Sequence, residues 1–180
     1  MKMKDFIQLL ILTVVFSSVL ILLRLYVFMP VIIKGHSMDP TLVPNERVIA
    51  LKKQPIERFD IVTFAAPDQI RTNYVKRVIG LPGDTIVYKG DQLYVNGKAA
   101  REPYLEKYKN TYHDEDLPFT EDFSLETLFG TARVPPGKIF VLGDNRRISK
   151  DSRLFGFIDE AAVSGNVKFA FWPLERIGTP

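Results

Sequence analysis

The chain has 180 residues, a formal net charge of +3 and no cysteine. The lack of cysteine excludes disulfides, thiolate zinc sites and a cysteine nucleophile. Only two histidines are present, His36 and His113, too few for a metal site built from imidazoles. Lys and Arg are mixed with Asp and Glu, so the small positive excess gives no reason to expect nucleic acid as a partner.

An uncharged apolar run extends from Phe6 to Leu23 near the N-terminus. A helix of that length spans about 27 Å, close to the roughly 30 Å of hydrocarbon in a bilayer. A cleaved signal peptide is the alternative, because Lys2 and Lys4 form a short basic segment before the run. However, no small-x-small cleavage site closes the run, so we predict a retained transmembrane anchor over residues 6–29.

The charges that flank this run favour a single-pass topology with the N-terminus inside the cell. Lys2 and Lys4 precede the run, although Arg24 and Lys34 follow it and weaken the contrast. We expect a cytoplasmic tail of residues 1–5. The domain of residues 30–180 would then lie on the extracytoplasmic face of the cell membrane, close to membrane lipid.

Beyond the anchor, short β-type runs alternate with Gly, Pro, Asn and Asp, which predicts a mainly β domain. The expected strands are Arg47–Leu51, Ile61–Phe64, Tyr74–Ile79, Thr85–Tyr88, Gln92–Val95, Ile139–Leu142 and Val167–Trp172. Thr85–Tyr88 and Gln92–Val95 would form a hairpin. Residues 98–133 are charged, rich in Tyr and poorly periodic, which suggests an inserted flap or subdomain, with one or two helical turns between Thr120 and Phe129.

Ser37 is a candidate nucleophile in the segment Gly35-His36-Ser37-Met38-Asp39-Pro40-Thr41-Leu42, soon after the anchor. A serine hydroxyl is a poor nucleophile unless a neighbouring base takes its proton. His36 is adjacent to Ser37, and neighbours on an extended backbone point to opposite faces. His113 lies in a loop-like acidic stretch with Asp114-Glu115-Asp116. Neither histidine is a convincing base.

Lys76 is the other candidate base, because it lies in a predicted strand between apolar residues. By strict alternation it shares a face with Tyr74 and Val78. Partial desolvation there would lower the pKa of its amine and make it a usable general base at neutral pH. The alternative is a surface lysine on an edge strand.

Three segments together resemble the bacterial type I signal peptidases. The first is Gly35-x-Ser37-Met38-x-Pro40-Thr41-Leu42, and the second is Arg77-Val78-Ile79-Gly80-Leu81-Pro82-Gly83-Asp84. The third contains Gly143-Asp144-Asn145-Arg146, Ser149, Asp151-Ser152-Arg153 and Gly156. They follow the order of the family behind one N-terminal anchor and cover about a third of the chain.

The resemblance implies a Ser-Lys endopeptidase on a largely antiparallel β-sheet or barrel-like fold, with no metal and no cofactor. Ser37 would be the nucleophile and Lys76 the general base. Ser149 would hydrogen-bond the lysine amine, and the polar residues Asp144, Arg146, Asp151 and Arg153 would support the site. Asp-Arg pairs within a turn can form bidentate bonds that fix the backbone.

Some family members carry a serine two residues before the nucleophile, and here that position is Gly35. The oxyanion would therefore depend on backbone N–H groups, with Ser37 and Gly35 as the candidates. The walls of the substrate pocket are expected from residues close to the two catalytic positions, namely Ile33, Met38, Leu42, Tyr74 and Val75.

The substrates implied by the resemblance are exported preproteins, cut after small residues at the first and third positions before the scissile bond. The export machinery is a further expected partner. Two alternatives stay open: a membrane-tethered non-catalytic β-domain, and a self-cleaving Ser-Lys protease. A self-cleaving repressor would carry a DNA-binding helical domain where this chain has an apolar run, and an inactive relative would have lost Ser37 or Lys76.

Overall fold

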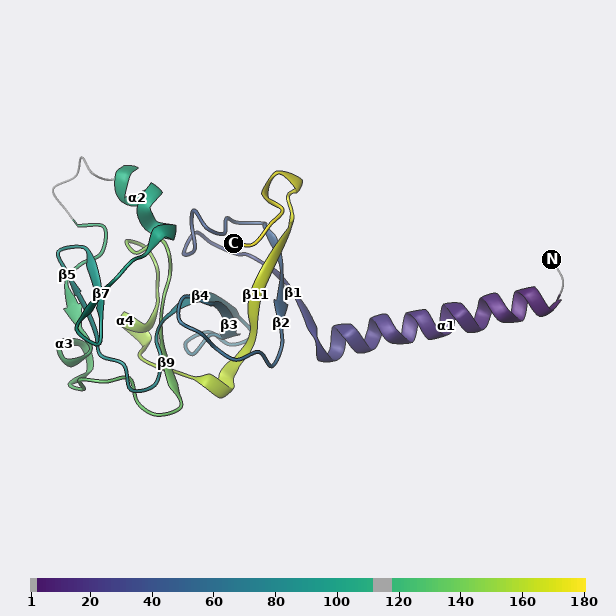
Figure 1. The fold of residues 1–180 in the computed structure, drawn as a ribbon, viewed down its shortest axis with the longest axis horizontal. Helices are drawn as coiled ribbons and strands as arrows, with labels where there is room; N and C mark the ends of the chain where they lie inside the picture. Colours follow the sequence, from purple (N-terminus) through teal and green to yellow (C-terminus); the bar gives the residue numbers. More distant parts are fainter. Residues whose placement is uncertain (1–2, 112–117) are drawn as a thin grey trace.

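A long N-terminal helix projects from a β-rich domain in the computed structural model, which describes residues 3–111 and 118–180 (Figure 1). This helix, α1 (Met3–Tyr26), is long and apolar enough to cross a membrane, and none of it is buried against the rest of the chain. Leu, Ile, Val and Phe surround it on all sides, as in a helix without a polar face. The predicted N-terminal apolar helix is confirmed.

Seven strands form the larger sheet in the order β1-β2-β11-β3-β4-β9-β10, and all of its pairings are antiparallel. Their bounds are β1 (Phe28–Ile32), β2 (Arg47–Leu51), β3 (Ile61–Ala65), β4 (Asn73–Gly80), β9 (Lys138–Leu142), β10 (Ile158–Asp159) and β11 (Val163–Trp172). The predicted largely antiparallel β-fold is confirmed.

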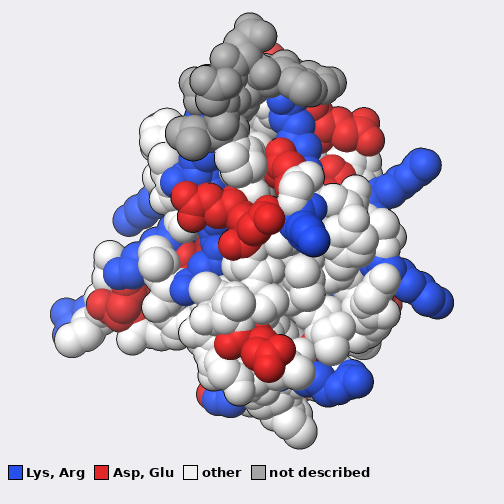
Figure 2. Space-filling view, turned by 90° about the vertical axis from the view of Figure 1, so that its left-hand side faces the viewer, with Lys and Arg blue, Asp and Glu red and all other residues white. Residues whose placement is uncertain are grey.

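Four strands form a smaller antiparallel sheet in the order β7-β6-β5-β8. They are β5 (Ile86–Lys89), β6 (Gln92–Val95), β7 (Lys98–Ala100) and β8 (Phe123–Ser124). This sheet lies at the end of the domain far from α1 (Figure 1). The face at that end carries acidic and basic side chains next to one another (Figure 2).

Short helices connect the strands. They are α2 (Glu106–Thr111), α3 (Leu125–Phe129), α4 (Ser152–Phe155) and the 3₁₀ turns η1 (Pro103–Leu105), η2 (Glu160–Ala162) and η3 (Leu174–Arg176). Helix α3 lies within the stretch for which a helical turn is predicted. It begins at a Ser124 cap and ends at Gly130, whose φ of 66° suits glycine.

Residues 98–133 are joined to the smaller sheet at both ends. β7 continues the predicted hairpin by pairing with β6, and β8 pairs with β5 on the other side. Between them lie η1 and α2, and residues 112–117 are outside the described part of the chain, as are His113 and the acidic cluster around it.

The core continues into the segment that follows β1. Ile33, Met38 and Leu42 are buried with residues of β2, β3 and β11. This packing holds both sides of Ser37 against the larger sheet. A second buried cluster joins β4 and β9 to the smaller sheet, so the two sheets share one continuous domain.

Candidate active site

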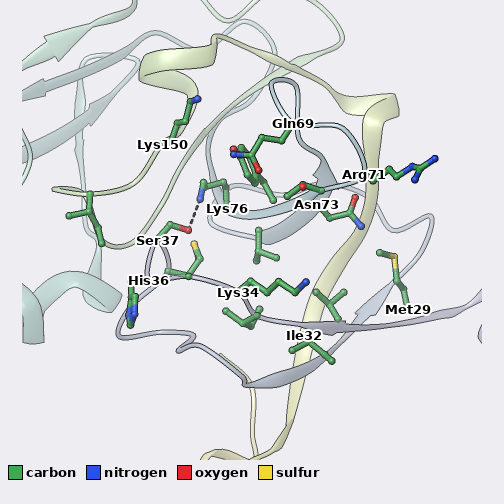
Figure 3. Close-up of a pocket in the computed structure, with 18 of the residues that line it drawn as sticks. Met29, Ile32, Lys34, His36, Ser37, Gln69, Arg71, Asn73, Lys76 and Lys150 are labelled. Atoms are coloured by element: carbon green, nitrogen blue, oxygen red, sulfur yellow. Dashed lines mark hydrogen bonds between the residues drawn. The ribbon is translucent and has the colours of Figure 1, made fainter.

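Ser37 and Lys76 form a hydrogen-bonded pair although 39 positions separate them in the chain. The Lys76 ammonium Nζ donates to Ser37 Oγ over 2.6 Å (Figure 3). Ser37 comes from the loop after β1, and Lys76 comes from the middle of β4. The structure therefore brings the two principal candidates into direct contact.

The backbone of Ser37 is held from two directions. Buried Ile33 and Met38 fix the loop on either side of it. On the other side, the N–H of Asn145 donates to the Ser37 carbonyl over 3.1 Å. The loop of residues 143–153, which follows β9, is thus tied directly to the candidate nucleophile.

Lys76 is almost completely buried, with 3% of its surface exposed. Burial lowers the pKa of its amine from 10.5 to about 8, and the negative charges of Asp151 and Asp144 oppose this shift. The ammonium also lies 5.3 Å from the centre of the Tyr74 ring, on the same face of β4. A large fraction of the amine is therefore neutral in mildly alkaline solution.

Two ion pairs support this pair of residues. Asp144 is fully buried and accepts bonds from both Arg77 Nε and Nη2, over 2.9 and 2.6 Å. Asp151 pairs with Arg153 over 2.9 Å and also accepts the Gly143 N–H over 3.1 Å. These charge-assisted bonds fix the 143–153 loop from inside.

Arg146 is directed into the smaller sheet; within its own loop, its Nε donates to the Gly143 carbonyl over 3.0 Å. Its guanidinium is buried with the Glu102 carboxylate at 2.5 Å and donates to the Tyr88 hydroxyl. Tyr104 donates to the same carboxylate over 2.6 Å, and its ring lies 3.9 Å from the Arg77 guanidinium carbon. Tyr104 and Glu102 thus connect Arg146 to Arg77.

Several of these partners do not appear among the predicted site residues. Arg77 directly follows Lys76 in a recognisable motif, so its position could have been noticed. Glu102 and Tyr104 lie in the stretch without periodicity, and no local pattern distinguishes them from the other charged and aromatic residues there.

Ser149 lies next to the pair but does not make the predicted bond to the lysine amine. Its hydroxyl is buried and has no hydrogen-bond partner in the described part of the chain. Its backbone N–H donates to Asn145. Gly143 makes this close approach possible, since a Cβ at that position would lie 2.1 Å from Ser149 Oγ and 2.4 Å from the Ser37 carbonyl oxygen.

A groove of about 830 Å³ leads to the Ser37–Lys76 pair. Four of the five expected pocket residues line it, namely Ile33, Met38, Tyr74 and Val75. Leu42 does not: it is completely buried in the core, where it packs with residues of β2, β3 and β11. The groove is also lined by residues 29–32, 34–37, 71–73 and 76, and by Gln69, Ile148 and Lys150.

The backbone N–H groups of Ser37 and Gly35 have no acceptor among the described residues. Gly35 has a φ of 75°, a left-handed conformation that favours glycine, and open space surrounds the position of a Cβ there. Both groups line the groove and are available to a ligand.

His36 is directed away from the Ser37–Lys76 pair and bonds Asp39 over 2.8 Å (Figure 3). Within residues 3–111 and 118–180, no group of three or more His, Asp or Glu side chains is placed to hold a metal ion. At the Ser37–Lys76 pair, a hydroxyl lies beside a buried amine.

Known proteins share this sequence and fold. The family described as signal peptidase, peptidase S26, matches residues 3–172. A signal peptidase I of Bacillus caldolyticus is 51% identical over 158 residues, covering 86% of this chain and 85% of that protein. A signal peptidase I of Streptococcus pneumoniae is 40% identical over 187 residues, covering 90% of this chain and 91% of that protein.

A solved structure agrees with these matches. The crystal structure of a signal peptidase I from Enterococcus faecalis is similar with a TM-score of 0.60 and 44% identity. The similarity covers 63% of this chain and 97% of the other. The family match, the sequence relatives and the solved structure agree, and the chain belongs to the signal peptidase family, peptidase S26.

Proposed function

We propose that the protein is a membrane-anchored serine endopeptidase that removes N-terminal signal peptides from exported preproteins. Membership of the signal peptidase family supports the reaction and the class of substrate. The observation that carries the mechanism is the 2.6 Å hydrogen bond between Ser37 and the buried amine of Lys76.

In this mechanism the neutral amine of Lys76 accepts the proton of Ser37 as Oγ attacks the scissile carbonyl. The tetrahedral intermediate collapses to an acyl-enzyme when the leaving amine takes a proton from the lysine ammonium. Lys76 then activates the water that hydrolyses the ester. The free N–H groups of Ser37 and Gly35 are the candidate donors to the oxyanion.

The groove supports binding of an extended peptide as an additional strand. β9 pairs with β4 only from Arg77 to Gly80, so the same edge of β4 lacks a strand partner from Asn73 to Lys76. β1 is the edge strand at the other end of the sheet, and it lines the groove opposite β4. A substrate strand between these edges would find backbone partners on both sides.

The proposed location follows from α1. Anchored in the bilayer by this helix, the domain would lie on the extracytoplasmic face, where preproteins emerge. β1 begins two residues after α1 ends, so one end of the groove lies next to the proposed membrane surface. The signal peptide's apolar segment would leave the bilayer close to the site.

Preprotein cleavage tests the function directly. The purified full-length protein in detergent is expected to cut a preprotein once, at the end of its signal peptide, as read by mass spectrometry of the mature N-terminus. The same preprotein with Leu in place of the small residue before the cut is expected to react at least about tenfold more slowly, because a shallow pocket excludes larger side chains. Equal cleavage of both would contradict the proposal.

The rate is expected to rise with pH because Lys76 must be neutral to act. With its pKa lowered to about 8 by burial, kcat/KM should increase about tenfold per unit below pH 7 and level off above about pH 9. Peptide cleavage measured from pH 5.5 to 9.5 would show this ascending limb. A flat profile between pH 6 and 9 would rule out Lys76 as the base.

A further inference from the structure

We propose that the groove selects its peptides by charge: it favours a carboxylate, and disfavours lysine or arginine, about four or five residues before the scissile bond. This inference rests on the proposed function, since it describes which peptides that site accepts. It concerns the charged part of the groove between the proposed membrane surface and Ser37. The walls that receive the small side chains are a separate part of the groove.

Apart from Lys76, the charged side chains that line the groove are three further cations. Lys34 comes from the segment after β1, Arg71 from the turn between β3 and β4, and Lys150 from the 143–153 loop. No Asp or Glu lines the groove within the described residues. On the face far from α1, by contrast, both signs of charge lie next to one another (Figure 2).

Only one of these three cations has a carboxylate partner. Lys150 forms an ion pair with Asp68, which raises the pKa of its amine and keeps it charged. Lys34 and Arg71 are exposed and have no carboxylate partner in residues 3–111 and 118–180. Two positive charges therefore line the groove without compensation, and a bound peptide could supply the missing carboxylate.

The chain positions of these cations place them relative to the cut. Lys34 precedes Ser37 by three residues, and Arg71 precedes Lys76 by five. Residues 35–37 form a bend and a turn, so extended spacing does not apply between Lys34 and Ser37. Asn73 to Lys76 are extended in β4 and span roughly 10 Å at about 3.3 Å per residue, and Arg71 lies in the turn before that strand. Figure 3 shows Arg71 and Met29 at the end of the groove away from the Ser37–Lys76 pair. Residues about four or five before the cut, in this outer part of the groove, would therefore lie beside Lys34 and Arg71.

The direction of the peptide follows from the membrane. The apolar part of a signal peptide precedes the cut, and the Met29 end of the groove lies close to the end of α1. Residues before the cut would thus occupy the groove from that end toward Ser37. A carboxylate there meets two cations, whereas an ammonium meets like charge.

The expected preference is moderate because the two cations are exposed. Each exposed ion pair changes affinity by about 1.4- to fivefold. Attraction of Glu and repulsion of Lys add, so kcat/KM should differ by about five- to twentyfold between two such peptides at low salt. At 1 M salt the screening length falls to about 3 Å, and the ratio should approach one.

The test compares peptides that differ at a single residue. Peptides with Glu, Gln or Lys about four or five residues before the cut, and with small residues kept at the first and third positions, are cleaved by the full chain in a zwitterionic detergent. The Glu-to-Lys ratio of kcat/KM is measured for the wild type and for Lys34→Gln/Arg71→Gln. We expect the ratio to fall to within about twofold of one in the double variant and to invert in Lys34→Glu/Arg71→Glu. Lys98→Gln, an exposed change on β7, should keep the wild-type ratio.

Two results would overturn the inference: a ratio near one in the wild type at low salt, or an unchanged ratio in the double variant. The double variant could instead lose binding to phosphatidylglycerol vesicles while the wild type shows no peptide preference. That result would assign the cations to anionic lipid and overturn the peptide proposal. Binding of the same peptides to Ser37→Ala reports the preference without cleavage. If the wild type cut none of the peptides, the proposed function would be contradicted. Peptide binding to Ser37→Ala would still test the charge preference.

Discussion

Ser37→Ala and Lys76→Met are each expected to lower preprotein cleavage by at least about a thousandfold. The first change removes the hydroxyl that would form the acyl-enzyme. The second removes the amine that is hydrogen-bonded to that hydroxyl, and it leaves an apolar side chain of similar length. Rates measured at enzyme concentrations high enough for single turnover would resolve the residual activity.

Matched variants separate chemistry from folding. Lys76→Arg keeps a positive charge but cannot accept a proton near neutral pH, so it should be as inactive as Lys76→Met. Lys98→Met makes the same substitution on an exposed strand and should retain full activity. Thermal unfolding should show Lys76→Met at least as stable as the wild type, because a desolvated amine is replaced by an apolar group. Wild-type cleavage by either Ser37→Ala or Lys76→Met would refute the Ser-Lys mechanism.

The parts of the site that could be predicted are those carried by contiguous motifs. Ser37 and Lys76 each lie in a short segment whose order and spacing can be recognised, so their pairing could be expected although they are far apart in sequence. The strands around them also have local signals. β2, β3, β4 and β9 overlap the predicted runs because each one is a short apolar segment between turn residues.

The pairing of charges could not be predicted, because it depends on tertiary contacts. The expectation of Asp-Arg pairs within one turn holds for Asp151 and Arg153. Asp144 instead pairs with Arg77, 67 positions away, and Arg146 with Glu102, 44 positions away. Periodicity contains no information about which carboxylate a buried arginine reaches once the strands have assembled.

β1 shows a different limit of sequence analysis. The predicted anchor extends over residues 6–29 and so includes residues 28 and 29, and no strand is predicted there. In the structure Phe28–Ile32 pairs with β2 along its whole length. Pro30 is tolerated because β1 is an edge strand, whose outer N–H groups need no partner in the sheet.

Gly143→Ala is expected to reduce activity by about a hundredfold although residue 143 does no chemistry. A Cβ at this position would lie 2.4 Å from the Ser37 carbonyl oxygen and 2.1 Å from Ser149 Oγ, so one or both must move. The 143–153 loop is held by the buried Asp144 and Asp151 pairs and cannot retreat freely. Displacing a nucleophile by about 1 Å can cost about a hundredfold in rate.

The control is Gly165→Ala on β11, where a Cβ would approach Ala50 Cβ at 3.1 Å. Both variants should lose about 1–3 kcal/mol of unfolding free energy from overpacking, as measured by thermal unfolding. Only Gly143→Ala should lose activity per folded molecule, since a Cβ at Gly165 would meet Ala50 and Leu51 and a Cβ at Gly143 would meet Ser37 and Ser149. If Gly143→Ala retained the wild-type kcat/KM, Ser149 alone would have moved aside, and the contact between Gly143 and Ser37 would not position the nucleophile.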